Sequence, residues 1–164
     1  MIAVKWDKRK LHSLLLDALK ANLNATLSAA ENAKEGSNHA DAIAKSKYDT
    51  FGLELSYFAG SQFERARAVE AKIAVMENTL FNDFDSDDDI DIGAIIQLQN
   101  GQKKIQTYLM SDIGAGLDLE YQGIKIIVIS PESPLGEAVI GLSQGDTVDA
   151  KAFQKNAYSI LAVH

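Results

Sequence analysis

Two long stretches of the chain repeat apolar or small residues at alternating steps of three and four, and this spacing constrains the fold more than any other feature. Residues 8–34 contain neither glycine nor proline, and their seam positions are Leu16, Leu19, Leu23, Thr26, Ala30 and Ala33. The second run ends near residue 80, and its seam positions are Leu55, Ala59, Gln62, Ala66, Val69, Ile73, Met76 and Leu80. Each run is long enough for a helix of roughly 40 Å. We expect the two helices to pair as an antiparallel coiled-coil hairpin.

The segment that joins the two runs breaks this spacing. Gly36, Ser37 and Asn38 are residues that end helices and begin turns, so we place the tip of the hairpin at about residues 35–50. Small seam residues near this turn allow the two helices to approach closely. Such a slim arm has little core of its own, and we expect the rest of the chain to support it.

The second half of the chain has the pattern of short β-strands. Asn100-Gly101 lies between two β-rich runs, which is the strongest short signal for a hairpin. The same pattern recurs around Gln122-Gly123, and residues 156–163 supply a further strand. Residues 133–148 have room for one short helix. We therefore predict an α+β chain in which the helical arm precedes a small sheet or half-open barrel.

An acidic run separates the two halves. Residues 83–91, DFDSDDDID, hold six aspartates and so account for most of the net charge of −7. The run lacks the glycine and glutamate that a calcium loop of the EF-hand type requires. We interpret it as a solvated linker, because like charges resist packing. The predicted organisation is an arm over 1–82, a linker over 83–91 and a C-terminal domain over 92–164.

The composition excludes several classes of protein. The chain has no cysteine, which rules out disulfides and thiolate metal sites, and no apolar run long enough to span a membrane. The acidic net charge disfavours binding to nucleic acid through a basic surface. His12 and His39 lack the partners that a zinc site needs, so we expect no intrinsic metal or cofactor and no enzyme activity of the chain's own. The residues before the first helix do not resemble a signal peptide, and we expect a cytoplasmic monomer.

Aromatic and acidic residues gather near the predicted tip. The aromatic residues are Tyr48, Phe51, Tyr57, Phe58 and Phe63. Two paired helices cannot bury so many rings, so we expect some of them to face outward as a contact surface. The acids are Glu31, Glu35, Asp41, Asp49 and Glu54. Such acids usually only solvate a surface, but an arm could deliver a carboxylate to a distant metal ion.

The two prolines of the chain, Pro131 and Pro134, both lie in the segment ISPESPLG, residues 129–136. Proline fixes its own φ and restricts the residue before it, so Glu132 and Ser133 are presented with little conformational freedom to lose on binding. Pro134 also suits the first turn of a helix. Both interpretations are compatible.

This combination of arm, acidic junction and β domain resembles the bacterial Gre transcript-cleavage factors. The resemblance extends over nearly the whole chain and is most specific over 129–148. There Glu132-Ser133-Pro134-Leu135 matches the acid-Ser-Pro-Leu turn of the family, and Gly145-Asp146 matches its Gly-Asp before a strand. Residues 67–80 are similar to the second arm helix. The resemblance implies that the C-terminal domain is FKBP-like.

The resemblance also implies a function. Gre factors dock their acid-Ser-Pro turn at the rim of the secondary channel of RNA polymerase, a role that falls here to Glu132, Ser133 and Pro134. Their arm reaches the polymerase active centre, where an Asp-x-x-Glu pair at the tip helps to hold a Mg²⁺ ion for hydrolysis of backtracked RNA. The partners implied are bacterial RNA polymerase and, indirectly, the 3′ end of the nascent RNA.

The tip departs from that pattern, and this leaves alternatives open. No acid-x-x-acid pair occurs between residues 31 and 54, so the candidate acids are Asp41, Asp49 and Glu35 at irregular spacing. The chain could stimulate cleavage with these acids, or it could compete for the channel without cleavage. From a different class, an FKBP-like domain with an aromatic arm could hold client proteins as a chaperone does.

Overall fold

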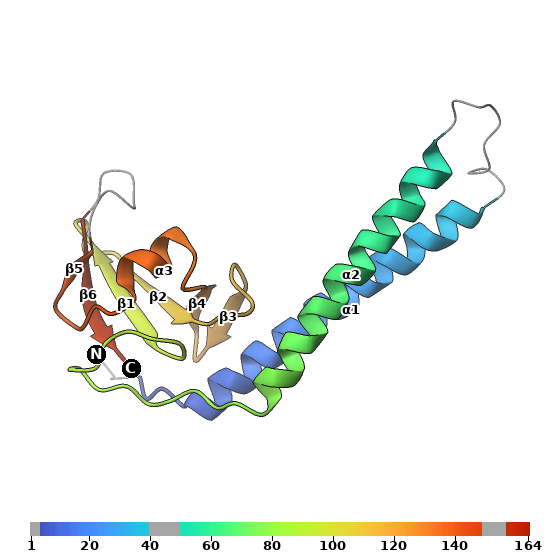
Figure 1. Ribbon diagram of the computed structural model, residues 1–164. Coiled ribbons are helices and arrows are strands. Elements are labelled where there is room, and N and C mark those ends of the chain that lie inside the picture. The colour runs from blue at the N-terminus through green and yellow to red at the C-terminus, as the bar shows by residue number, and fades with distance from the viewer. Residues whose placement is uncertain (1–3, 40–49, 149–156) are drawn as a thin grey trace. The chain divides into compact units, whose positions relative to one another are not determined.

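The structure is a computed structural model that describes residues 4–39, 50–148 and 157–164. The chain divides into two compact units (Figure 1). One unit is Leu16–Asn78, and the other combines Met1–Leu15 with Thr79–His164. The predicted α+β class, with a helical arm followed by a β-sheet and one short helix, is confirmed. Within the described part of the chain, no helix has the length and apolar character needed to cross a membrane.

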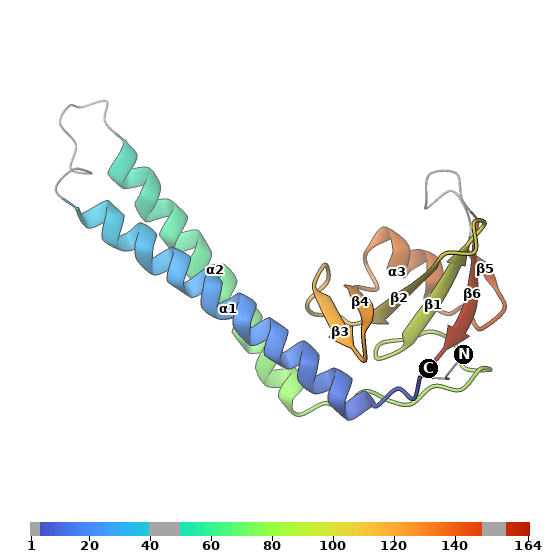
Figure 2. The same cartoon turned by 180° about the vertical axis from the view of Figure 1, so that it is seen from behind.

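The helical unit is the predicted antiparallel hairpin. Helices α1 (Lys8–Asn38) and α2 (Phe51–Glu77) run side by side in both views (Figures 1 and 2). The residues buried along their seam are Leu19, Leu23, Ala30, Ala59, Ala66, Ile73 and Met76. Leu16 is only half-buried, and Leu80 is 60% exposed because α2 ends at Glu77. The heptad spacing therefore predicted the seam correctly but overran the end of the second helix.

The C-terminal unit contains a six-stranded sheet with the order β3-β4-β2-β1-β6-β5. Its strands are β1 (Ile95–Asn100), β2 (Ile105–Met110), β3 (Asp118–Tyr121), β4 (Ile124–Ile129), β5 (Thr147–Val148) and β6 (Tyr158–Val163). Strands β2 and β4 pair in parallel, and every other neighbouring pair is antiparallel. The three strand regions predicted from the sequence are all present.

The two predicted hairpins close in different ways. At Gln122-Gly123 both residues have positive φ, 52° and 79°, as the predicted two-residue turn requires. At Asn100 the chain instead reverses through residues 101–104, with the left-handed residue at Lys103. The Asn100 side chain stabilises this longer loop, because its Oδ1 accepts from the backbone N–H of Gln102 at 3.0 Å and of Lys104 at 2.9 Å.

Helix α3 (Pro134–Val139) covers one face of the sheet and closes a hydrophobic core (Figures 1 and 2). Val139 is fully buried in this core. The sheet contributes alternate residues of β1 and β2, as expected when one face of a strand is buried. It also contributes two residues of β6, on either side of an irregularity in the pairing of β6 with β1. These core residues are Ile96, Leu98, Tyr108, Met110, Ile160 and Val163.

The acidic run is packed onto the C-terminal unit, which differs from its interpretation as a solvated linker. Ile90 is 1% exposed, and its N–H donates to the Leu142 carbonyl at 2.8 Å. Phe84 packs against the core, and the Ser143 hydroxyl donates to the Asp89 carboxylate at 3.0 Å. The aspartates of the run are exposed, whereas the apolar residues between them hold it to the domain.

The first residues of α1 also lie in the C-terminal unit, although the sequence placed them in the arm. Leu11 and Leu15 are completely buried, and the Tyr121 hydroxyl accepts from Asp7 N–H at 3.2 Å and donates to the Lys5 carbonyl at 3.1 Å. A helical period says which side of a helix is buried but not which partner covers it. In the structure, the boundary between the two units falls within α1, between Leu15 and Leu16.

Candidate functional site

The segment between β4 and α3 forms a tight turn in which Ser133 makes hydrogen bonds to residues before and after it. The Ser133 N–H donates to the Ser130 carbonyl at 3.0 Å, and its hydroxyl donates to the same oxygen at 2.7 Å. The hydroxyl also accepts from Gly136 N–H at 3.0 Å, which makes Ser133 the N-cap of α3. With its hydroxyl used in these two contacts, Ser133 holds the shape of the turn.

Gly136 allows this turn to be so tight. A Cβ at this position would lie 1.8 Å from the Ser130 carbonyl oxygen and 2.8 Å from its carbon. Real side chains never approach backbone this closely, so any other residue would push the start of α3 away from Ser130. The sequence analysis missed this residue, and a glycine in the first turn of a predicted helix was the available signal.

The turn presents Glu132 and Pro134 to solvent. Both residues are exposed, and Ser133 between them is half-buried. Pro134 occupies the first turn of α3, as predicted. The three residues predicted as a site are therefore together, but they differ in what they can do. Glu132 and Pro134 can contact a partner, and Ser133 positions them.

The candidate acids of the arm are less fully described. Glu35 is exposed in the last turn of α1. The neighbouring Gly36 lies close to α2, because a Cβ at this position would be 3.4 Å from the Leu55 side chain. Asp41 and Asp49 lie outside the described residues, so their place stays a prediction. No cluster of three or more metal-ligating side chains occurs within residues 4–39, 50–148 and 157–164.

The first half of α2 carries an exposed apolar surface, as the density of aromatic residues predicted. Phe51 is 59% exposed, Tyr57 72% and Phe58 49%, and Leu53 beside them is 55% exposed. Phe63 is half-buried. Tyr48, the fifth aromatic residue of the predicted set, lies outside the described residues.

Lys8 is a buried cation that the sequence analysis did not single out. Its Nζ donates to the carbonyls of Gly93 and, at 2.7 Å, of His164, and lies 4.9 Å from the centre of the Phe84 ring. Burial lowers the pKa of Lys8 to about 8, against the opposing effect of Asp83. Burial also lowers the pKa of His164, and the nearby Lys8 charge acts in the same direction. The sequence does not distinguish Lys8 from the other basic residues of the segment KWDKRK, so its burial could not be predicted.

Comparison with known proteins identifies the C-terminal domain. Residues 85–164 match the family described as "Transcription elongation factor, GreA/GreB, C-term". No curated protein sequence matches the chain. The match begins within the acidic run, which agrees with the packing of that run on the domain.

Solved structures give a weaker similarity over a larger part of the chain. GreA factor homolog 1 (Gfh1) of Thermus thermophilus is 19% identical over 91% of this chain and 94% of that chain, with a TM-score of 0.37. Gfh1 of Thermus aquaticus is 17% identical over 90% of this chain and 95% of that chain, with a TM-score of 0.36. The assignment therefore depends on the domain match. Residues 85–164 are a domain of the GreA/GreB C-terminal family of transcription elongation factors.

Proposed function

We propose that the chain binds bacterial RNA polymerase through the turn at residues 130–136. The observation that carries this proposal is the turn itself, in which Glu132 and Pro134 are exposed on a backbone fixed by Ser133 and Gly136. A pre-organised loop loses little entropy when it binds, and an exposed carboxylate can pair with a basic group on the partner. The family match over the same domain supports polymerase as that partner.

The helical hairpin then enters the secondary channel of the polymerase and acts on backtracked complexes. In the leading mechanism the tip brings Asp41, Asp49 or Glu35 to a Mg²⁺ ion shared with the polymerase active centre. Carboxylates are the hard ligands that Mg²⁺ prefers, and a second ion held there would activate water for cleavage of the RNA near its 3′ end. The chain is in this account a monomeric cytoplasmic accessory factor with no catalytic site of its own.

A second mechanism is favoured by the surface of α2. The first two turns of this helix expose Phe51, Leu53 and Tyr57. Its only acid there, Glu54, accepts a hydrogen bond from the Thr50 hydroxyl at 2.7 Å. An apolar surface suits contact with protein walls better than metal binding. In this mechanism the arm occupies the channel and competes with cleavage factors.

One assay distinguishes the two mechanisms. Backtracked elongation complexes carrying 3′-labelled RNA are incubated with the protein, and the release of short 3′ fragments is measured. Cleavage stimulation predicts faster release, which the double substitution Asp41→Ala and Asp49→Ala removes. Asp17→Ala is the matched control, because it removes an exposed acid from the N-terminal third of α1, and it should leave release unchanged.

Competition predicts no added release, together with suppression of the cleavage that an authentic Gre factor stimulates. A folded protein that shows neither effect would contradict the proposed function. Capture of unfolded client proteins would then favour the chaperone-like alternative.

A further inference from the structure

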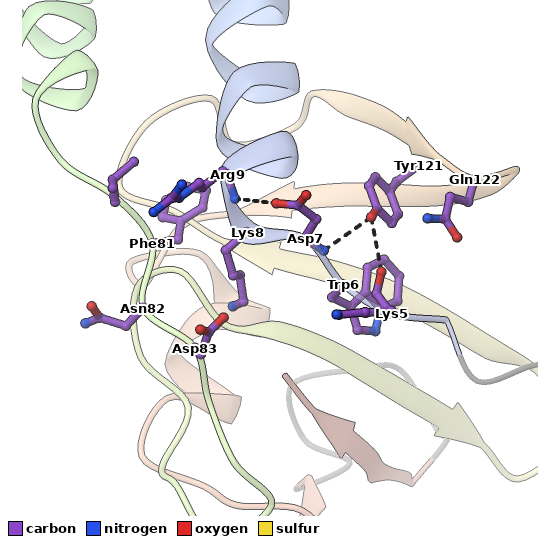
Figure 3. A pocket seen from close by; sticks show the side chains of 11 residues that line it. Lys5, Trp6, Asp7, Lys8, Arg9, Phe81, Asn82, Asp83, Tyr121 and Gln122 are labelled. Atoms are coloured by element: carbon purple, nitrogen blue, oxygen red, sulfur yellow. Dashed lines mark hydrogen bonds between the residues drawn. The ribbon is translucent and has the colours of Figure 1, made fainter.

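The C-terminal unit contains a pocket that the proposed function does not use. It has a volume of about 840 Å³ and lies between residues 5–9, residues 80–83 and the β3–β4 turn (Figure 3). This volume is within the range of small-molecule sites. The pocket is built from different elements than the turn at 130–136.

Aromatic side chains form part of its wall and are held in place by neighbouring groups. Trp6 stacks on Tyr121 with ring centres 5.5 Å apart, and the Tyr121 hydroxyl is fixed by the backbone of Lys5 and Asp7. Phe81 meets the His12 ring edge-to-face at 5.3 Å. This part of the wall is therefore formed before any ligand binds.

Asp7 and Lys8 of the pocket already have hydrogen-bond partners. The Asp7 carboxylate accepts from the backbone N–H groups of Arg9 at 3.0 Å and Lys10 at 3.1 Å, so it caps the start of α1. Asp83 is the acid whose charge acts on Lys8, and the Lys8 ammonium is held by two backbone carbonyls. The capped helix end and the buried lysine offer nothing further to a ligand.

Two cations remain available. Lys5 and Arg9 line the pocket and are exposed, and within the described part of the chain neither side chain has an ion pair or hydrogen bond. Unpaired cations beside aromatic walls are notable in a chain whose net charge is −7. Guanidinium and ammonium groups bind phosphate oxygens, and aromatic walls favour a flat apolar body.

We propose that this pocket binds a small aromatic phosphate ester, the chemistry of a nucleoside phosphate. Lys5 and Arg9 bind the phosphate, and the base lies against the side of the pocket formed by Trp6 and Phe81. The pocket is then a ligand site of the C-terminal unit that is separate from polymerase docking.

Trp6 provides the test because it is the only tryptophan of the chain and lines the pocket. The full-length protein is titrated with guanosine monophosphate, guanosine and inorganic phosphate, and Trp6 fluorescence is excited at the red edge of its absorption. We expect a saturable change in fluorescence with guanosine monophosphate, and weaker binding of guanosine alone and of inorganic phosphate alone. The double substitution Lys5→Ala and Arg9→Ala should weaken binding by about tenfold or more.

Lys104→Ala is the matched control, because it removes an exposed cation from the β1–β2 loop. Circular dichroism verifies that each variant is folded, and equilibrium dialysis with labelled nucleotide gives a second readout that is independent of Trp6. The proposal is overturned if dialysis and fluorescence both show no saturable binding. It is equally overturned if the pocket variant binds like the wild type, if Lys104→Ala weakens binding to the same degree, or if phosphate alone binds as tightly as the nucleotide.

Discussion

At the scale of single residues, the turn at 130–136 depends on one hydroxyl and one missing side chain. Ser133 connects the Ser130 carbonyl to Gly136 N–H, and Gly136 lets that carbonyl approach. The sequence predicted the exposed members of the turn, because prolines on both sides of Glu132-Ser133 constrain the backbone. It could not predict the need for Gly136, since that need arises from a contact with backbone six residues earlier.

Replacing Gly136 with alanine should destabilise the C-terminal unit by about 2 kcal/mol or more, because the new Cβ collides with backbone that cannot move freely. The matched control is Gly101→Ala. At Gly101 a Cβ would meet nothing within 4 Å, so this change should be nearly neutral. Urea unfolding followed by Trp6 fluorescence measures both. Equal stability of the two variants would contradict the close approach at Ser130.

Removing the Ser133 hydroxyl should cost about 1 kcal/mol, the usual effect of losing an N-cap. Ser133→Ala leaves the backbone bond from Ser133 N–H to Ser130 in place, so we expect a weakened turn rather than an unfolded domain. Ser133→Thr should restore most of the stability, because threonine also caps helices. Chemical denaturation of the three proteins under one condition makes the comparison. If Ser133→Ala leaves the free energy of unfolding unchanged, the cap does not stabilise the turn.

Lys8 should make stability depend on pH. Below pH 8 both the folded and the unfolded chain hold the proton, so the unfavourable effect of burying the charge is constant. Between the folded pKa of about 8 and the ordinary value of 10.5, the unfolded chain binds more protons, and stability should rise with pH. The expected gain is on the order of 1–3 kcal/mol.

Unfolding of wild type and Lys8→Met is compared from pH 7.5 to 9.5. The free energy of unfolding of the wild type should rise relative to the variant over this range. A constant difference between the two proteins would contradict a lowered pKa for Lys8.

At the scale of elements, the helical hairpin is the part most readily predicted from sequence. The repeat of apolar residues identified the buried seam. The exposed surface of α2 was predictable because the paired helices cannot bury all of the aromatic residues near the tip. The end of α2 was missed because Leu80 continues the spacing after the helix has stopped at Glu77. The ion pair between Lys20 and Glu77, at 2.5 Å, joins the helices near this end but is half-exposed and contributes little.

Small residues keep the two helices close together, and Ala66 tests this directly. It is 2% exposed in the seam, so Ala66→Leu should overpack the hairpin and destabilise it by about 1–3 kcal/mol. Ala68→Leu adds the same atoms to an exposed position of the same helix and should have little effect. Thermal unfolding followed by circular dichroism measures the loss of helix. An equally stable Ala66→Leu variant would mean that the seam has room for a larger side chain.

At the scale of the whole molecule, the order of the arm and the β domain was predictable, whereas the division between them was not. Ile90 and Leu11 belong to the C-terminal unit, although one lies in an acidic run and the other in a heptad-like helix. Which surface an apolar residue covers depends on tertiary packing, and a local pattern does not contain that information. The residues of the turn at 130–136 were predictable because they are contiguous. The pocket was not, because its walls come from three separate segments.

The most direct test of the central claim is the affinity of the protein for purified bacterial core RNA polymerase. We predict specific binding that Glu132→Ala weakens by about tenfold or more, whereas changing the exposed acid Glu120 on β3 to alanine should have no effect. A folded wild type that does not bind the polymerase, or binding that is indifferent to Glu132, would contradict docking through the turn at residues 130–136.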